Sequence, residues 1–338
     1  MQEQLEIAGR SQADRGKRRN GDHQAHRELP EGRYALVVAD GVGSAPCDHK
    51  ASELACSMCI QTLSVDTELP IERVMQSAVL AADEALRHEP GACEGMMSTL
   101  VLAVWDLPQG RLWHCAVGDS RLYALRGEVL EQLNVEQRKA VVRRGKDGRP
   151  LRQSGAVVVA EGITQAIGAG VKELVVHGSD AKDIDAVLLC TDGYYSATPS
   201  PLHDMESIMK QIELDRAVGS LVDLLRDAQS DDLTMLIARR RTEIVSLNQV
   251  RQRIRSGGDL DHVAYRELAQ AALHILPEFI SAAEHEPARR LLDLLQQTGI
   301  DLGREALGAA VSLMMNEPER HHSGNYQRLV ALMRKSRG

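Results

Sequence analysis

Short apolar runs of strand length alternate with amphipathic segments over the first 240 or so residues. The runs are rich in branched aliphatic and small residues, as core strands are, and they lie at 34–39, 99–105, 112–117, 187–190 and 233–238. Apolar residues that return at steps of three and four predict helices at 49–63, 71–88 and 202–229. Two helices in succession separate the first strand from the second, which does not fit a strict alternation of strands and helices. The pattern therefore predicts a layered α+β fold.

The strand signals stop at three consecutive arginines, residues 239–241. Beyond them, apolar residues recur on one helical face at 268–280 and again at 326–333. A chain of 338 residues is long enough for two domains. We expect a first domain at 1–242 and an all-helical C-terminal domain at 243–338, which either braces the first domain or binds a protein.

Composition narrows the class of protein. The chain is 43% hydrophobic and 26% charged, and no apolar run approaches the roughly 20 residues that cross a bilayer. Its N-terminus lacks the apolar stretch of a secretory signal. The net charge of -8 argues against nucleic acid as the main partner. We expect a cytoplasmic protein that binds neither nucleic acid nor membrane.

The six cysteines do not have the dense, regular spacing of a disulfide scaffold. Cys56 and Cys59 form a CxxC pair, but they lie in a predicted helix, and no second CxxC completes a zinc site. We expect reduced, mostly buried thiols, with redox or metal use as the alternative.

Four aspartates stand at the ends of predicted strands. Asp40, Asp119 and Asp192 each follow a strand, and Asp231 stands just before one. Neighbouring antiparallel strands run in opposite senses, so the end of one and the start of the next can share an edge. Such a cluster of carboxylates needs a compensating cation, and oxygen ligands suit Mg²⁺ or Mn²⁺. Two such ions would support phosphoester hydrolysis.

A simpler interpretation exists for two of these aspartates. Asp40-Gly41 and Asp192-Gly193 are Asp-Gly pairs after strands, and such pairs are common in turns that have no function. The grouping of four aspartates favours the metal site.

Six motifs, in order along residues 9–240, resemble those of the PP2C family of metal-dependent protein phosphatases. They are VADGVGSAPCDHKAS, MMSTLVLAV, VGDSRLYAL, GITQAIGAG, LLCTDGYYSA and SDDLTMLIA. The GDSR segment and the two Asp-Gly motifs are the most specific. The resemblance implies a central antiparallel β-sandwich flanked by helix pairs, in agreement with the layered pattern.

The resemblance also implies metal ligands. Asp40 would bridge two ions and so take part directly in catalysis, with the Gly41 carbonyl as a further ligand. Asp192 and Asp231 would hold the first ion, and Asp22, in the NGD segment, would hold the second through water.

A third, weaker ion would bind Asp119, as in bacterial members of the family. Asp231 is expected to be the ligand rather than its neighbour Asp232. Gly21 stands where the family has an acidic residue, which would weaken the second ion.

Phosphate recognition in the family uses an arginine shortly before this segment. Here the stretch 15–19 reads RGKRR. We expect Arg18 to contact the phosphate as a catalytic residue, with Arg15 and Arg19 as close alternatives.

The resulting hypothesis is a protein serine/threonine phosphatase that uses two Mn²⁺ or Mg²⁺ ions, with a third as an option. Its partners would be a phosphorylated protein, the serine/threonine kinase that phosphorylates it, and a protein or second copy bound through the C-terminal helices. The alternative is a catalytically weak module that binds a phosphoprotein and regulates through its helical domain. Retention of all four strand-end aspartates favours the enzyme.

Overall fold

The computed structural model describes residues 4–65, 69–142, 144, 147–154, 156–209, 211, 214–241, 247–256, 276 and 286–291. The chain divides into two compact units, Met1–Arg240 and Arg241–Gly338. In the second unit the structure describes α6 (Leu247–Ser256) and a few further helical positions. The helices predicted at 268–280 and 326–333 lie almost wholly outside the described residues.

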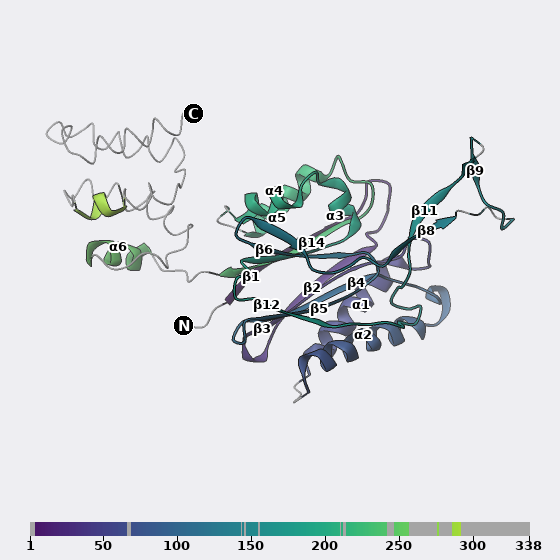
Figure 1. Cartoon of the computed structure of the whole chain (residues 1–338), viewed down its shortest axis with the longest axis horizontal. Helices are drawn as coiled ribbons and strands as arrows, with labels where there is room; N and C mark the ends of the chain where they lie inside the picture. The colour runs from purple at the N-terminus through teal and green to yellow at the C-terminus, as the bar shows by residue number, and fades with distance from the viewer. Residues whose placement is uncertain are drawn as a thin grey trace. The chain divides into compact units, whose positions relative to one another are not determined.

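Two five-stranded sheets lie face to face in the first unit (Figure 1). The first has the order β1-β14-β13-β6-β7, with bounds Gln4–Gln12, Leu233–Arg241, Ala186–Cys190, Arg121–Arg126 and Val129–Gln132. The second has the order β12-β5-β4-β3-β2, with bounds His177–Asp180, Arg111–Val117, Leu100–Asp106, Arg33–Asp40 and Asp22–Leu29. Neighbours in the second sheet pair antiparallel, as β13 does with both β14 and β6. The predicted strands are confirmed as β3, β4, β5, β13 and β14.

Helices cover the outer face of each sheet (Figure 1). α1 (Asp48–Leu63) and α2 (Ile71–Arg87) lie against the second sheet. α3 (Asp192–Ala197), α4 (Pro201–Met209) and α5 (Leu214–Leu225) lie against the first. The fold is therefore the expected β-sandwich between layers of helices.

The central strands are apolar at successive positions because both of their faces are buried. In β3, Ala35 and Val37 pack toward α1 and α2, whereas Leu36 and Val38 pack into the core between the sheets. All four side chains are fully buried. Since successive side chains of a strand point to opposite faces, a run without alternation marks a strand buried on both sides.

The single helix predicted at 202–229 is wrong. The segment forms two helices, α4 and α5, and Gln211 between them is not helical. Arg239 of β14 reaches this break and donates hydrogen bonds to the carbonyls of Ile208 (3.3 Å) and Gln211 (3.0 Å). A buried arginine thus satisfies carbonyls at the end of α4 that an unbroken helix would have paired internally.

A narrow ribbon extends from the end of the sandwich where α3 begins (Figure 1). β8 (Arg138–Val142) pairs antiparallel with β11 (Val159–Ile163), and β9 (Arg152–Gln153) pairs with β10 (Ala156–Val157) nearer the tip. Among the described residues, no helix has both the length and the apolar character needed to cross a bilayer.

Candidate metal centre

The fold gathers the five predicted aspartates at one rim of the sandwich. Asp22 opens β2 directly opposite Asp40 at the end of β3, and Asp192 begins α3 after a single residue that follows β13. Burial raises the pKa of Asp40 well above its ordinary value, and the charges of Asp22, Asp192, Asp231 and Asp119 raise it further. Carboxylates from both sheets therefore share one region of high negative charge.

Gly41 and Gly193 are required by close packing rather than by turns. A Cβ on Gly41 would overlap the backbone carbonyl of Asp48, and a Cβ on Gly193 would overlap that of Asp232. Neither glycine has the left-handed φ that many turns demand, and Gly193 lies within α3. The interpretation of these Asp-Gly pairs as simple turns is therefore not supported.

Hydrogen bonds from a neighbouring segment hold the backbone of Asp40. Its carbonyl accepts from the Ser98 hydroxyl (2.9 Å) and from the Thr99 amide (2.7 Å), and its own amide donates to Thr99 Oγ1 (3.0 Å). The Gly41 amide donates to the carbonyl of Gly21 (2.9 Å). These bonds fix the turn at which β3 leaves the sheet.

The donor set fits a hard divalent cation. Asp192 Oδ1 is buried and has no hydrogen-bond partner among the described residues. Burial and the charges of Asp119 and Asp231 raise the pKa of Asp192 to about 6. Burial likewise raises the pKa of Asp22 to about 8, against a hydrogen bond of 2.7 Å from Thr191 Oγ1. A buried carboxylate oxygen without a partner is costly unless a cation binds it.

The carboxylates lie close together, but they do not surround a common position for an ion. In the part of the chain that the structure describes, no three His, Cys, Asp or Glu side chains form a closed ligand set. Three of the five face protein cations: Asp231 faces Lys17, and both Asp119 and Asp192 face Arg138.

Asp231 and Asp232 have different environments. Asp232 is buried, and its two oxygens accept from the amides of Asp14 (2.7 Å) and Gly21 (2.6 Å). Asp231 is half-exposed and faces Lys17 Nζ at 2.6 Å. Asp232 therefore anchors the segment before β2, whereas Asp231 remains at the rim.

The basic segment before β2 reaches this rim through Lys17, which the sequence analysis missed. Lys17 Nζ also donates to Asp232 at 2.9 Å. Burial lowers the pKa of Lys17, but the hydrogen bonds and charges of Asp231 and Asp232 outweigh burial, so the pKa is raised. No local pattern in the sequence distinguishes Lys17 from its basic neighbours. Lys17 lies at the rim because Asp232 binds the backbone amides of Asp14 and Gly21, on either side of it in the sequence.

The arginines of this segment lie differently from Lys17. Arg15 pairs with Asp227, and Arg19 Nη1 lies 3.0 Å from His49 Nε2. Arg18 is exposed, and within the described residues it has no hydrogen bond or ion pair. The structure does not bring Arg18 into contact with the aspartates, so its phosphate role stays a prediction.

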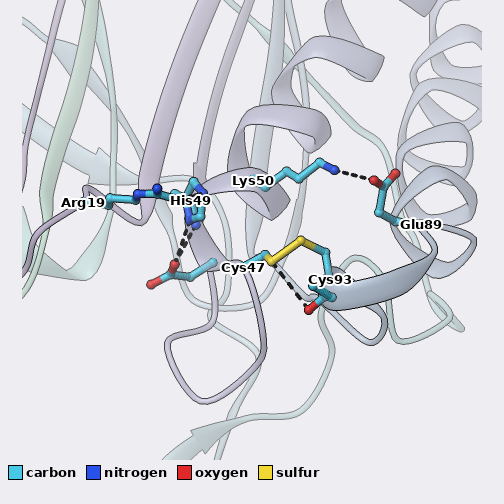
Figure 2. The surroundings of a disulfide bond; sticks show 8 residues. Arg19, Cys47, His49, Lys50, Glu89 and Cys93 are labelled. Carbon is cyan, nitrogen blue, oxygen red and sulfur yellow. Dashed lines mark hydrogen bonds and ion pairs between the residues drawn. A yellow bond between two sulfur atoms is a disulfide. The ribbon is translucent and has the colours of Figure 1, made fainter.

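A disulfide bounds the loop that follows Asp40 (Figure 2). Cys47, which precedes α1, is bonded to Cys93 in the segment that leads to β4. The prediction of reduced thiols is therefore wrong for these two residues, because the fold brings positions 46 residues apart in sequence together. The other four cysteines are free and buried.

The architecture and the rim of carboxylates define a class, the metal-dependent phosphatases with a β-sandwich between helical layers. A sequence model of the protein phosphatase 2C family matches residues 8–233. The chain therefore belongs to this family, and it is a protein serine/threonine phosphatase.

Solved structures agree with the fold. The serine/threonine phosphatase Stp1 of Staphylococcus aureus is 17% identical and aligns with a TM-score of 0.57 over 70% of this chain and 94% of its own. The phosphatase PstP/Ppp of Mycobacterium tuberculosis is 21% identical, with a TM-score of 0.54 over 70% of this chain and 98% of its own. A PstP catalytic domain in complex with two manganese ions is 22% identical, with a TM-score of 0.53 and the same coverage. Comparison with curated protein sequences finds no match.

Proposed function

We propose that this chain hydrolyses phosphoserine and phosphothreonine in proteins at a site for two Mn²⁺ or Mg²⁺ ions. The observation that carries the proposal is the buried, unpartnered Oδ1 of Asp192 among four other aspartates. When bound, two ions at such a site lower the pKa of a shared water and neutralise the oxygens of a phosphoryl group. The manganese complex of the PstP catalytic domain supports the choice of metal.

We assign the ligand roles that the family resemblance implies, and the grouping of the side chains supports them. The charges of the other four aspartates all raise the pKa of Asp40, and we assign Asp40 to bridge both ions. The Gly41 carbonyl lies beside it. Asp192 and Asp231 hold the first ion, and Asp22 supports the second.

Asp231 is the better ligand of the Asp pair because Asp232 is already committed. Both oxygens of Asp232 accept backbone amides, so turning Asp232 toward an ion would leave two N–H groups unpaired. Asp231 is half-exposed, and its Oδ1 accepts from Lys17 Nζ and from the amide of Asp232.

Lys17 offers a positive charge for the substrate phosphate. An ammonium group has three donors, and Lys17 directs two of them at Asp231 and Asp232. The third is available to a phosphoryl oxygen. Arg18 stays the predicted second contact, with Arg15 and Arg19 as alternatives.

The test is hydrolysis of p-nitrophenyl phosphate with Mn²⁺ or with EDTA. We expect Mn²⁺-dependent turnover by the wild type and at least about a hundredfold loss in Asp192→Asn, because the substitution removes a charge that holds the first ion. Asp183→Asn is the matched control, since Asp183 is an exposed aspartate at the opposite end of β13. Equal turnover in Asp192→Asn and Asp183→Asn would refute the site.

The absence of an acidic side chain at Gly21 is compensated in space. A Cβ at position 21 would lie 3.1 Å from Asp48 Oδ2 and 3.0 Å from Asp232 Oδ2. Asp48 therefore brings a carboxylate to the place that a residue 21 side chain would enter, and a longer side chain there would displace it. The position of Asp48 supports an active enzyme over the regulatory alternative. A calorimetric titration that detects no Mn²⁺ binding would favour the regulatory alternative instead.

Partners beyond the phosphoprotein are part of the same proposal. Stp1 and PstP are serine/threonine phosphatases, and we extend that substrate class to this chain, with a serine/threonine kinase as its counterpart. Recruitment of a protein or a second copy by residues 243–338, and a cytoplasmic location, stay predictions.

A further inference from the structure

Arg138 places a positive charge between two of the aspartates. It is the first residue of β8, and its Nε and Nη2 lie 2.8 and 2.7 Å from Asp119 Oδ2. Nη2 also lies 3.5 Å from Asp192 Oδ2 and donates to Tyr195 Oη at 2.8 Å. The guanidinium therefore occupies the gap between Asp119 and Asp192.

The surroundings of Arg138 hold the guanidinium in that gap. The carboxylate of Glu136 lies 3.4 Å from Nε of Arg138, and it also accepts a hydrogen bond from Nε of Arg121 at 2.6 Å. The Arg121 guanidinium stacks over the Tyr195 ring, 3.5 Å from its centroid. Tyr195 donates its hydroxyl to the backbone carbonyl of Asp119 at 3.2 Å. A planar guanidinium bound by carboxylates and a phenol on several sides is confined to one position.

The two oxygens of Asp192 have different surroundings. Oδ2 faces Arg138, whereas Oδ1 is buried without a partner. Arg138 thus neutralises the side of Asp192 that faces Asp119 and leaves the other side for an ion. In Asp119 the oxygen that faces the gap, Oδ2, accepts two N–H groups of Arg138.

We propose that Arg138 is a built-in cation that takes the place of a third metal ion at Asp119, so that the centre binds two ions and not three. The proposal rests on the proposed function for the other two ions. An arginine stays charged at all physiological pH values, and a divalent ion that approached Asp119 would meet its charge at close range. The gap is therefore filled at every metal concentration, and Arg138 is a positioning residue that fixes Asp119 and Asp192.

Counting bound Mn²⁺ tests this proposal directly. Isothermal titration calorimetry on the full chain, checked by metal analysis after desalting, should give two ions for the wild type. Arg138→Met, which keeps much of the length but removes the charge, should gain a third, weaker ion. Arg138→Lys keeps a positive charge and should stay at two.

The double variant Arg138→Met with Asp119→Asn shows where the third ion binds. We expect it to return to two ions, because the new site depends on the Asp119 carboxylate. Arg138→Gln is a second neutral variant, expected to gain the same ion as Arg138→Met. Circular dichroism and thermal melting establish which variants are folded.

Several outcomes would overturn the inference. Three ions on the wild type would show that Arg138 does not exclude the third, whatever the variants do. Two ions on folded Arg138→Met, with a raised KM for p-nitrophenyl phosphate, would make Arg138 a substrate contact instead. If the wild type bound no ion, the proposed function itself would be wrong. If the wild type bound three ions and showed Mn²⁺-dependent turnover, the proposed function would hold and only the role of Arg138 would be rejected.

Discussion

Asp231 and Asp232 are adjacent aspartates, and we expect their substitution by asparagine to have different effects, one on Mn²⁺ binding and the other on stability. Asp232→Asn should destabilise the first unit with little direct effect on the first ion. Asp231→Asn should weaken Mn²⁺ binding with little effect on stability. The contrast follows from burial, since the Asp232 side chain is 1% exposed and that of Asp231 is 48% exposed.

The magnitude can be estimated from the hydrogen bonds of Asp232. Its oxygens accept the amides of Asp14 and Gly21 and the ammonium of Lys17. The side chain of asparagine has one oxygen acceptor and one NH2 group. One of the two backbone amides therefore loses its hydrogen bond to a charged group, which contributes about 1.5–3 kcal/mol, and faces an N–H donor instead. We expect a loss of about 3 kcal/mol in the free energy of unfolding. Asp231→Asn removes a half-exposed ion pair and should cost under about 1 kcal/mol.

Tryptophan fluorescence during urea unfolding is the assay, because both tryptophans, Trp105 and Trp113, lie in the first unit. Their signal therefore reports on that unit. A parallel Mn²⁺ titration measures binding. If Asp232→Asn were as stable as the wild type, or if Asp231→Asn were the less stable variant, the division of roles between the two aspartates would be wrong.

Three further predictions use the same unfolding assay or the phosphatase assay. Replacing Cys47 and Cys93 by serine should lower the free energy of unfolding by up to about 4 kcal/mol, the chain-entropy value for a loop closed over a separation of 46 residues; a change below about 1 kcal/mol would contradict it. Asp83→Ala should cost at least about 3 kcal/mol, since this buried carboxylate accepts three amides of the turn at 168–171, and an unaltered midpoint would count against that estimate. A chain that ends at Thr242 should keep turnover of p-nitrophenyl phosphate and lose activity toward a phosphoprotein target; full activity toward both would rule out recruitment by the C-terminal residues.

Much of the sandwich could be predicted because its central strands are buried on both faces. Runs such as residues 34–39 are then apolar at every position, and a local pattern is sufficient to find them. Strands with exposed positions were missed. β2 is an example: its exposed middle reads His26, Arg27 and Glu28, and it is a strand because it pairs with β3 along its whole length.

Four of the predicted aspartates were found because each stands at the end of a predicted strand, whereas Asp22 was found only through the family resemblance. Their neighbours could not be found in this way. Arg138 belongs to a polar stretch without any strand signal before it. It reaches Asp119 because Gln137, just before β8, donates its amide to the carbonyl of Gly118, just after β5. The Cys47–Cys93 bond likewise depends on two loops that the helices α1 and α2 bring together.

The sequence by itself determined the fully buried strands, the family and the carboxylate positions, because burial periodicity and motif spacing are local properties of a chain. Only the tertiary structure decided which charges compensate the carboxylates. Lys17 faces Asp231 across 214 positions of sequence, and Arg138 faces Asp192 across 54. The energy of such pairs depends on distance and burial in space, and neither quantity is present in the order of residues.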